Sequence, residues 1–207
     1  MDKKIKKIYW AGDLWNFKDL IGNELLVNQF NLDAKNKYQA ILPQNLEATA
    51  IDKKSIRDAD LELLFSCDAI VANFDGDDLD SGTVAEFCFA KFLDLPAVLF
   101  RSDFRNSNDV ATCLEPWNLM LSNYPRTKTL LIPARPKLPQ IGSPNYLNFA
   151  SKEIVKALDE VFNTPKLYQT KEEYFFLYQA ALKSAGPSLE KLFSSNRIKE
   201  IIENRFL

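Results

Sequence analysis

A strand, an acidic loop and a helix follow one another between Asp68 and Ala90, and this unit restricts the folds that are open to the chain. Residues 69–74 are a mostly apolar run of strand length, and the helix predicted over residues 84–93 is apolar almost all round, which requires burial on more than one side. Open α/β sheets bind ligands at such strand-to-helix loops. Glu86, expected in the first turn of the helix, is therefore either a helix cap or part of a site.

The same alternation of strands and helices extends over the N-terminal two thirds of the chain. It predicts a parallel sheet with helices on both faces. The further strands are expected at residues 7–12, 38–42, 97–100 and 129–132, and the further helices at residues 20–30 and 55–65.

The composition changes after Ile132, where four prolines and Gly142 indicate a stiff connector. Beyond it, three helical patterns are predicted, over residues 147–162, 171–184 and 187–206. We therefore divide the chain into an α/β domain, residues 1–135, and a connector with a helical C-terminal extension, residues 136–207.

Charge and composition exclude several classes of function. A net charge of −2 does not favour binding to nucleic acid or to a membrane surface. No apolar run approaches the roughly 20 residues that span a bilayer, and no signal peptide is recognised. The three cysteines lack C-x-x-C spacing, so we expect reduced thiols in a cytoplasmic protein. Histidine is absent, which leaves Asp, Glu, Tyr, Lys and Cys for acid–base or nucleophilic chemistry.

Two interpretations of the acidic loop remain open at this point. Thr83 and Glu86 match the T-x-x-E capping box, which contributes about 1 kcal/mol to a helix and is common. Against this structural role, four carboxylates crowd the loop without a basic neighbour, and like charges repel. The spacing of Asp80 and Glu86 also allows a carboxylate pair, as glycosyl transfer requires. The four crowded acids are Asp75, Asp77, Asp78 and Asp80.

Several motifs in sequence order resemble those of the nucleoside 2-deoxyribosyltransferases, over about residues 8 to 126. Tyr9-Trp10-Ala11-Gly12 is similar to the opening Y-x-x-G of that family. Asp80 to Glu86 matches its D-x-G-x-x-x-E pattern, and Asn118-Leu119-Met120 reproduces its N-L-M. The resemblance implies an α/β, flavodoxin-like (Rossmann-like) open sheet of about five strands, with neither a metal nor a cofactor.

The resemblance also assigns catalytic roles. Glu86 is implied as the nucleophile that attacks C1′ of a deoxynucleoside, forming a covalent deoxyribosyl-enzyme before a second base takes the sugar with retention. Tyr9 is implied to orient Glu86. Asp80 and Asp60 hold the positions on the base and sugar sides, and we expect Asp80 to donate the proton while Asp60 holds the base.

Further residues are implied to bind the substrate. Gln44 resembles a base-contacting amide, and Leu14 and Trp15 lie where the family stacks apolar side chains on the base. Gly12 closes the first block and is expected beside the substrate. A role in a surface loop for Gln44, and buried packing for Trp15, are about as common as these roles.

Asn118 and Met120 are implied to reach the site of a neighbouring subunit, which would make the active unit a homo-oligomer. The partners expected are otherwise small molecules, namely deoxynucleosides and free nucleobases. Arg101 and Arg105 lie past the fourth strand, where they could bind phosphate.

This sequence departs from the pattern of the family in two ways, and both affect the substrates that we expect it to accept. About 75 residues follow the last strand, so a terminal carboxylate cannot be assigned to the site, and Asp13 and Lys18 lie in the first loop. We expect a 2-deoxyribosyltransferase. The alternatives are a deoxynucleoside or deoxynucleotide N-glycosidase that uses water, and a non-catalytic nucleoside-binding domain with Glu86 as a cap.

Overall fold

The computed structural model describes residues 4–47, 52–76, 78–103, 116–132 and 144–206, and its centre is a parallel sheet of five strands. The strand order is β2-β1-β3-β4-β5, the flavodoxin-like order. This confirms the predicted α/β class. The strands are β1 (Lys6–Ala11), β2 (Tyr38–Ile41), β3 (Ala69–Asn73), β4 (Ala97–Arg101) and β5 (Thr127–Leu131).

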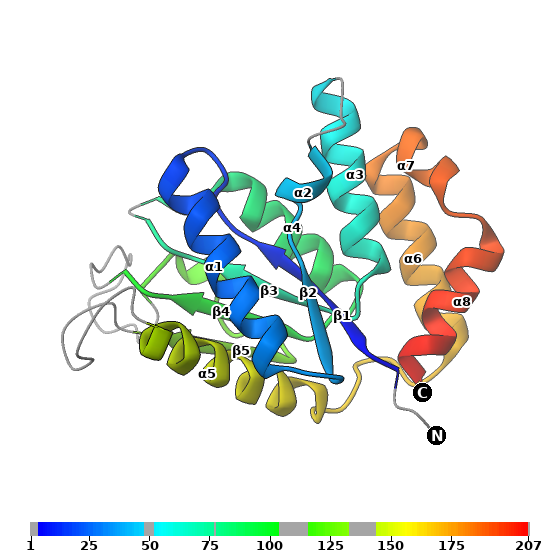
Figure 1. Cartoon of the computed structure of the whole chain (residues 1–207). Coiled ribbons are helices and arrows are strands. Elements are labelled where there is room, and N and C mark those ends of the chain that lie inside the picture. The colour runs from blue at the N-terminus through cyan, green and yellow to red at the C-terminus, as the bar shows by residue number, and fades with distance from the viewer. Residues whose placement is uncertain (1–3, 48–51, 77, 104–115, 133–143, 207) are drawn as a thin grey trace.

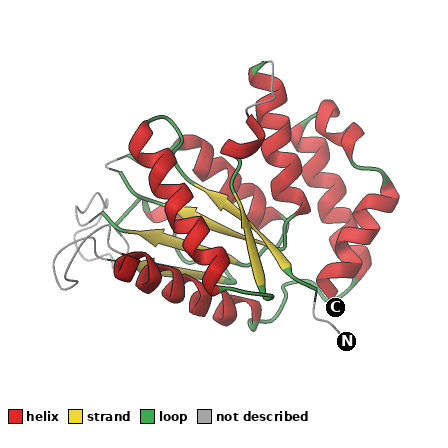
Figure 2. Ribbon diagram, viewed as in Figure 1, coloured by secondary structure: helices red, strands yellow, loops and turns green. Residues whose placement is uncertain are grey.

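Helices cover both faces of the sheet, as Figures 1 and 2 show. Helices α1 (Phe17–Asp33) and α5 (Pro144–Phe162) pack against each other on one face, and α3 (Lys53–Ser66) and α4 (Ser81–Phe92) lie on the other. Helix α5 lies beyond the predicted boundary at residue 135, yet it covers β4 and β5. The sheet therefore takes one of its covering helices from the C-terminal part of the chain.

Alternate residues of β1 build the two cores. Tyr9 and Ala11 join the cluster beneath α3 and α4, whereas Ile8 and Trp10 join the cluster beneath α1 and α5. All four are essentially inaccessible to solvent. Successive side chains of a strand point to opposite faces, so the direction of Tyr9 is fixed by the strand itself.

The last three helices of the chain form an outer layer against α3 and α4, seen in orange and red in Figure 1. Tyr178 donates a hydrogen bond to the Phe65 carbonyl at 2.7 Å, and Arg197 contacts Glu62 at 2.6 Å. These helices thus cover the outside of α3 and α4, whereas α5, in the same C-terminal extension, lies on the sheet. They are α6 (Lys171–Ala185), α7 (Pro187–Leu192) and α8 (Ser195–Phe206).

The structure corrects two predictions of local structure. The helix expected over residues 187–206 is broken after Leu192, because Ser194 accepts a hydrogen bond from the Arg197 amide and so begins a new helix. A short helix, α2 (Gln44–Glu47), occupies part of the expected polar loop. Among the helices of the described residues, none is long and apolar enough to cross a membrane.

Candidate active site

The Tyr9 hydroxyl donates a 2.5 Å hydrogen bond to Oε1 of Glu86, and this contact is the centre of the candidate site. Tyr9 lies on β1, with its ring sealed beneath α3 and α4, whereas Glu86 on α4 is half-buried. The rigid sheet therefore holds the phenol in place, and the phenol fixes one oxygen of the carboxylate. The fold brings these two residues together from positions 77 apart.

Tyr9 is held in its neutral form. Burial raises the pKa of Tyr9 well above its ordinary value, and the charges of Glu86 and then Asp60 raise it further. Because a raised pKa favours the protonated phenol, Tyr9 remains a hydrogen-bond donor at neutral pH. Asp60, on α3, is half-buried, and its charge is among those that raise the pKa of Tyr9.

Asp80 begins α4, which corrects the sequence interpretation of this helix. Its Oδ2 accepts hydrogen bonds from the Thr83 amide at 2.7 Å and the Thr83 hydroxyl at 2.9 Å. Asp80 is therefore the N-cap, and the proposed capping box of Thr83 and Glu86 is wrong. The first turn of α4 contains no acid. Glu86 lies in the second turn, not in the first turn as predicted, and the effect of the helix dipole falls off beyond the first turn.

Trp15 is tied to the same cap. Its indole Nε1 donates to Oδ1 of Asp80 at 3.0 Å, and its own amide donates to Asp13 at 3.0 Å. The Trp15 side chain remains 82% exposed, which rules out the alternative of buried packing. An exposed, anchored indole beside a carboxylate is suited to stacking on a flat ligand. Leu14, next to it, is half-buried.

Gly12 is explained by close packing at the end of β1. A Cβ atom there would lie 3.3 Å from the side-chain amide of Asn23 and 3.3 Å from Cβ of Asn73. Asn23 is buried and donates to the carbonyl of Asp13 at 3.1 Å, which holds the loop that carries Trp15. Sequence reasoning missed this support from Asn23, since a lone asparagine in a helix carries no recognisable signal.

Asp75, one of the four crowded acids of the loop, has a structural role that the sequence did not predict. Its Oδ1 accepts from the amides of Ser102 and Asp103 at 2.6 and 2.7 Å, and its Oδ2 accepts from the Ser102 hydroxyl at 2.7 Å. These bonds join the ends of β3 and β4. Asp78 is exposed, and Asp77 lies outside the described residues. The acids of the loop are thus separated into different roles.

Arg101 is not placed at the surface, where it could have bound phosphate. Its side chain is buried, and Nη1 donates to the Phe74 carbonyl at 2.6 Å. It holds the end of β3 from inside the protein. Arg105 lies outside the described residues.

The remaining predicted residues lie around the carboxyl ends of the strands. Asn118 is exposed and caps a short 3-10 helix, η1 (Leu119–Leu121), by accepting from the Met120 amide at 2.9 Å. Met120 is 70% exposed. Gln44 is half-buried, and its amide lies 3.5 Å from the Leu20 carbonyl of α1. Within the described residues, no group of three or more acidic, cysteine or histidine side chains could hold a metal ion.

A family model described as nucleoside 2-deoxyribosyltransferase matches residues 8–120, more than half of the chain. The chain belongs to the nucleoside 2-deoxyribosyltransferase family. The match includes Tyr9, Asp60, Asp80, Glu86 and Asn118. It ends before β5, so the outer helical layer of this deoxyribosyltransferase family member lies outside it.

Solved structures are similar to this family member at low identity. A conserved protein from Enterococcus faecalis V583 is 21% identical, with 75% of this chain and 98% of that chain covered and a TM-score of 0.55, which supports the fold alone. A 2-deoxyribosyltransferase from Bacillus psychrosaccharolyticus is 20% identical, with 57% of this chain and 81% of that chain covered and a TM-score of 0.44. A 2-deoxyribosyltransferase from Leishmania mexicana is 23% identical, with 73% of this chain and 97% of that chain covered and a TM-score of 0.47. No curated protein matches the chain.

Proposed function

We propose that this protein transfers the 2-deoxyribosyl group from a 2′-deoxynucleoside to an acceptor nucleobase through a covalent intermediate on Glu86. Membership of the family supports deoxyribosyl transfer at the general level. The observation that supports the mechanism is the 2.5 Å hydrogen bond from Tyr9 to Glu86. It orients a half-buried carboxylate on α4, on the face of the sheet that also carries Asp60.

In the first step, a Glu86 oxygen attacks C1′ as the glycosidic C–N bond breaks, and the bonding electrons leave with the base. The developing oxocarbenium character is stabilised by the carboxylate. Tyr9 keeps its proton and holds the carboxylate at the attacking angle, because its pKa is raised well above the ordinary value by burial and by Glu86.

Asp80, entering the step as the carboxylic acid, supplies the proton that the departing base requires. Its Oδ2 is occupied by Thr83, whereas Oδ1 accepts from the exposed Trp15 indole and faces the loop where a base would stack. In the second step, a ring nitrogen of the acceptor base attacks C1′, Glu86 leaves, and Asp80 takes a proton back. Two displacements at one carbon give overall retention.

The chemistry uses no cofactor and no metal, and we place the protein in the cytoplasm, in nucleoside salvage. The test is base exchange. The protein is incubated with 2′-deoxyinosine and adenine, and separately with thymidine and cytosine, and the products are separated by chromatography. New deoxynucleosides, absent with ribonucleosides, support transfer. Free base without a new nucleoside would identify an N-glycosidase that uses water. If no product forms in either mixture, the protein is a non-catalytic nucleoside-binding domain.

We further propose that the site is completed by a second copy of the chain through Asn118 and Met120. Both side chains are exposed next to Leu119, which is 51% exposed, on the surface beyond the buried Trp117. Mixing inactive Glu86→Ala and Asn118→Ala chains should restore part of the transfer activity, because a mixed oligomer contains one intact site. Native mass spectrometry would show whether the two variants exchange subunits. If they exchange and no activity is recovered, the shared site is refuted.

A further inference from the structure

A cavity of about 470 Å³ lies at the amino-terminal edge of the sheet, opposite the candidate active site. It is bordered by the residues that start or precede the strands, by the connector between α5 and α6, and by the end of α8. Its volume is typical of sites for small molecules, which span about 300–1,000 Å³. The fold therefore has a cavity that deoxyribosyl transfer does not use.

The cavity is rich in cations. Four basic side chains line it, against two carboxylates, Asp68 and Asp94. Asp94 is already held by Arg126, whose Nη1 lies 2.7 Å from its Oδ2, and by the Leu167 amide at 3.1 Å. Asp68 accepts from the Lys7 amide at 2.7 Å. The cavity therefore carries an excess of positive charge. The four bases are Lys6, Arg126, Lys166 and Arg205.

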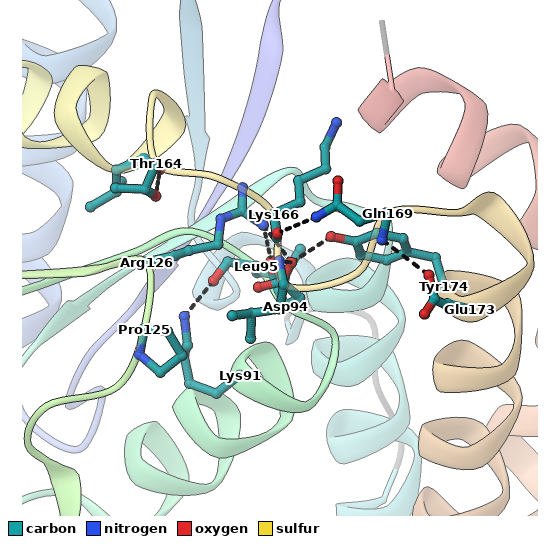
Figure 3. A network of polar contacts seen from close by, with 12 residues as sticks. Lys91, Asp94, Leu95, Pro125, Arg126, Thr164, Lys166, Gln169, Glu173 and Tyr174 are labelled. Carbon is teal, nitrogen blue, oxygen red and sulfur yellow. Dashed lines mark hydrogen bonds and ion pairs between the residues drawn. The ribbon is translucent and has the colours of Figure 1, made fainter.

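Arg126 has one buried donor that the described part of the chain does not satisfy. Its side chain is only 7% exposed, and its Nη1 donates to the carbonyl and the carboxylate of Asp94. Its Nε is buried and has no hydrogen-bond partner among the described residues. A buried donor without a partner is costly unless a ligand or water satisfies it. Figure 3 shows Arg126 reaching toward Asp94, with Tyr174 on the far side of the same carboxylate.

The two lysines lie over aromatic rings. Lys166 lies 4.2 Å above the Phe206 ring and Lys6 lies 4.8 Å above the Phe162 ring. Burial lowers the pKa of Lys166, and the positive charges of Arg126 and Lys6 lower it further, while Asp94 opposes them. Three cations therefore repel one another around one space, and a bound anion would relieve that repulsion.

Aromatic rings form the other wall of the cavity. Tyr174 packs edge-on against Tyr168 and Phe206, with ring centroids 5.9 and 5.4 Å away. Arg205, on the same side, donates to the carbonyls of Phe65 and Cys67, so it is held in position. A fixed apolar wall next to clustered cations is suited to a molecule with an anionic end and a flat, apolar end.

We propose that this cavity binds a small phosphate anion, with the phosphate oxygens between Lys6, Arg126 and Lys166 and any organic group against the aromatic wall. Phosphate fits these donors, since arginine recognises its oxygens in a fork geometry and lysine neutralises it as a compact charge. The two sources of such an anion are free phosphate and a phosphate ester.

Isothermal titration calorimetry of the full chain tests the proposal with three probes: inorganic phosphate, phenyl phosphate and phenol. We expect both phosphates to bind and phenol not to bind. Tighter binding of phenyl phosphate would identify an ester that uses the aromatic wall, and equal binding would identify free phosphate. The variant with Lys6→Gln and Lys166→Gln should bind at least about tenfold more weakly, because two charge-assisted contacts are lost.

Lys183→Gln is the matched control, since Lys183 is exposed on α6 and does not line the cavity. It should bind phosphate as the natural chain does. Thermal unfolding shows whether the double variant is folded, and its midpoint should not fall, because two mutually repelling charges are removed. Equal phosphate affinity in a folded double variant would overturn the proposal, as would the absence of binding at millimolar phosphate or an equal affinity for phenol.

Discussion

The two ends of α4 hold carboxylates in opposite ways. At the start, Asp80 accepts from the exposed Trp15, and in the second turn the half-buried Glu86 accepts from Tyr9. At the end, the Asp94 side chain is fully buried, and one of its oxygens accepts from Arg126, Tyr174 and the Leu167 amide. The carboxylates at the start of the helix lie at partly exposed positions that a substrate can reach, whereas the carboxylate at its end is fully enclosed and holds the structure together.

The backbone explains why Asp94 takes the structural role. It follows the C-cap of α4 in the left-handed conformation, at φ 53°, and the Leu95 amide donates back to the Ala90 carbonyl at 2.9 Å. This geometry closes the helix and turns Asp94 inward. Asp80 begins the helix at a partly exposed position, where its Oδ2 caps the helix through Thr83 and its Oδ1 accepts from the exposed Trp15 indole.

The largest effect is expected from Glu86→Gln. The variant keeps a hydrogen-bond acceptor for Tyr9 but loses the nucleophile, so kcat for base exchange should fall by at least about a thousandfold. Its unfolding free energy should change by less than about 1 kcal/mol, since Glu86 is not a helix cap. Asp78→Asn, an exposed acid of the same loop, is the control and should keep full activity. Equal activity in both variants would contradict the assignment.

The next largest effect should come from the other end of the helix, and on stability. Asp94→Ala leaves the Arg126 guanidinium buried without its partner, and this should cost about 3 kcal/mol of unfolding free energy. Chemical denaturation measures the loss, and kcat of the folded fraction should change little. A variant as stable as the natural chain would show that Asp94 does not hold this corner together.

Asp80→Asn should separate capping from proton donation. Asparagine and aspartate cap helices about equally well, so stability should change by only a few tenths of a kcal/mol, while kcat should fall about a hundredfold. The loss should be smaller for a nucleoside with a good leaving group, because such a base needs less protonation. Full activity in Asp80→Asn would leave Asp80 as a cap only.

The smallest effect is expected from Tyr9→Phe. Losing one hydrogen bond to a charged acceptor should lower kcat about tenfold. Because the pKa of Tyr9 is raised well above its ordinary value, the phenol stays protonated. The ratio of kcat of the natural chain to kcat of Tyr9→Phe should therefore be constant between about pH 6 and 9. A ratio that changes across this range would mean that Tyr9 titrates and does not orient Glu86 as a permanently neutral donor.

The fold was predictable because strand and helix periodicities follow from burial on a covered parallel sheet. The pairing of Tyr9 with Glu86 was implied by the resemblance to the family and is present in the structure. The N-cap at Asp80 was not predicted, since Asp80 and Thr83 both fit the start of the helix and only backbone geometry distinguishes them. The cavity around Lys166 was invisible for a related reason: its walls come from several separate parts of the chain.

The most direct test of the central claim is the mass of the protein after brief incubation with a 2′-deoxynucleoside, without acceptor base, followed by acid quenching. We predict an increase equal to one deoxyribosyl group, located by peptide mapping on Glu86 and absent from Glu86→Gln. New deoxynucleosides formed in the base-exchange assay, together with no adduct on Glu86 at any time point or an adduct on another residue, would contradict it.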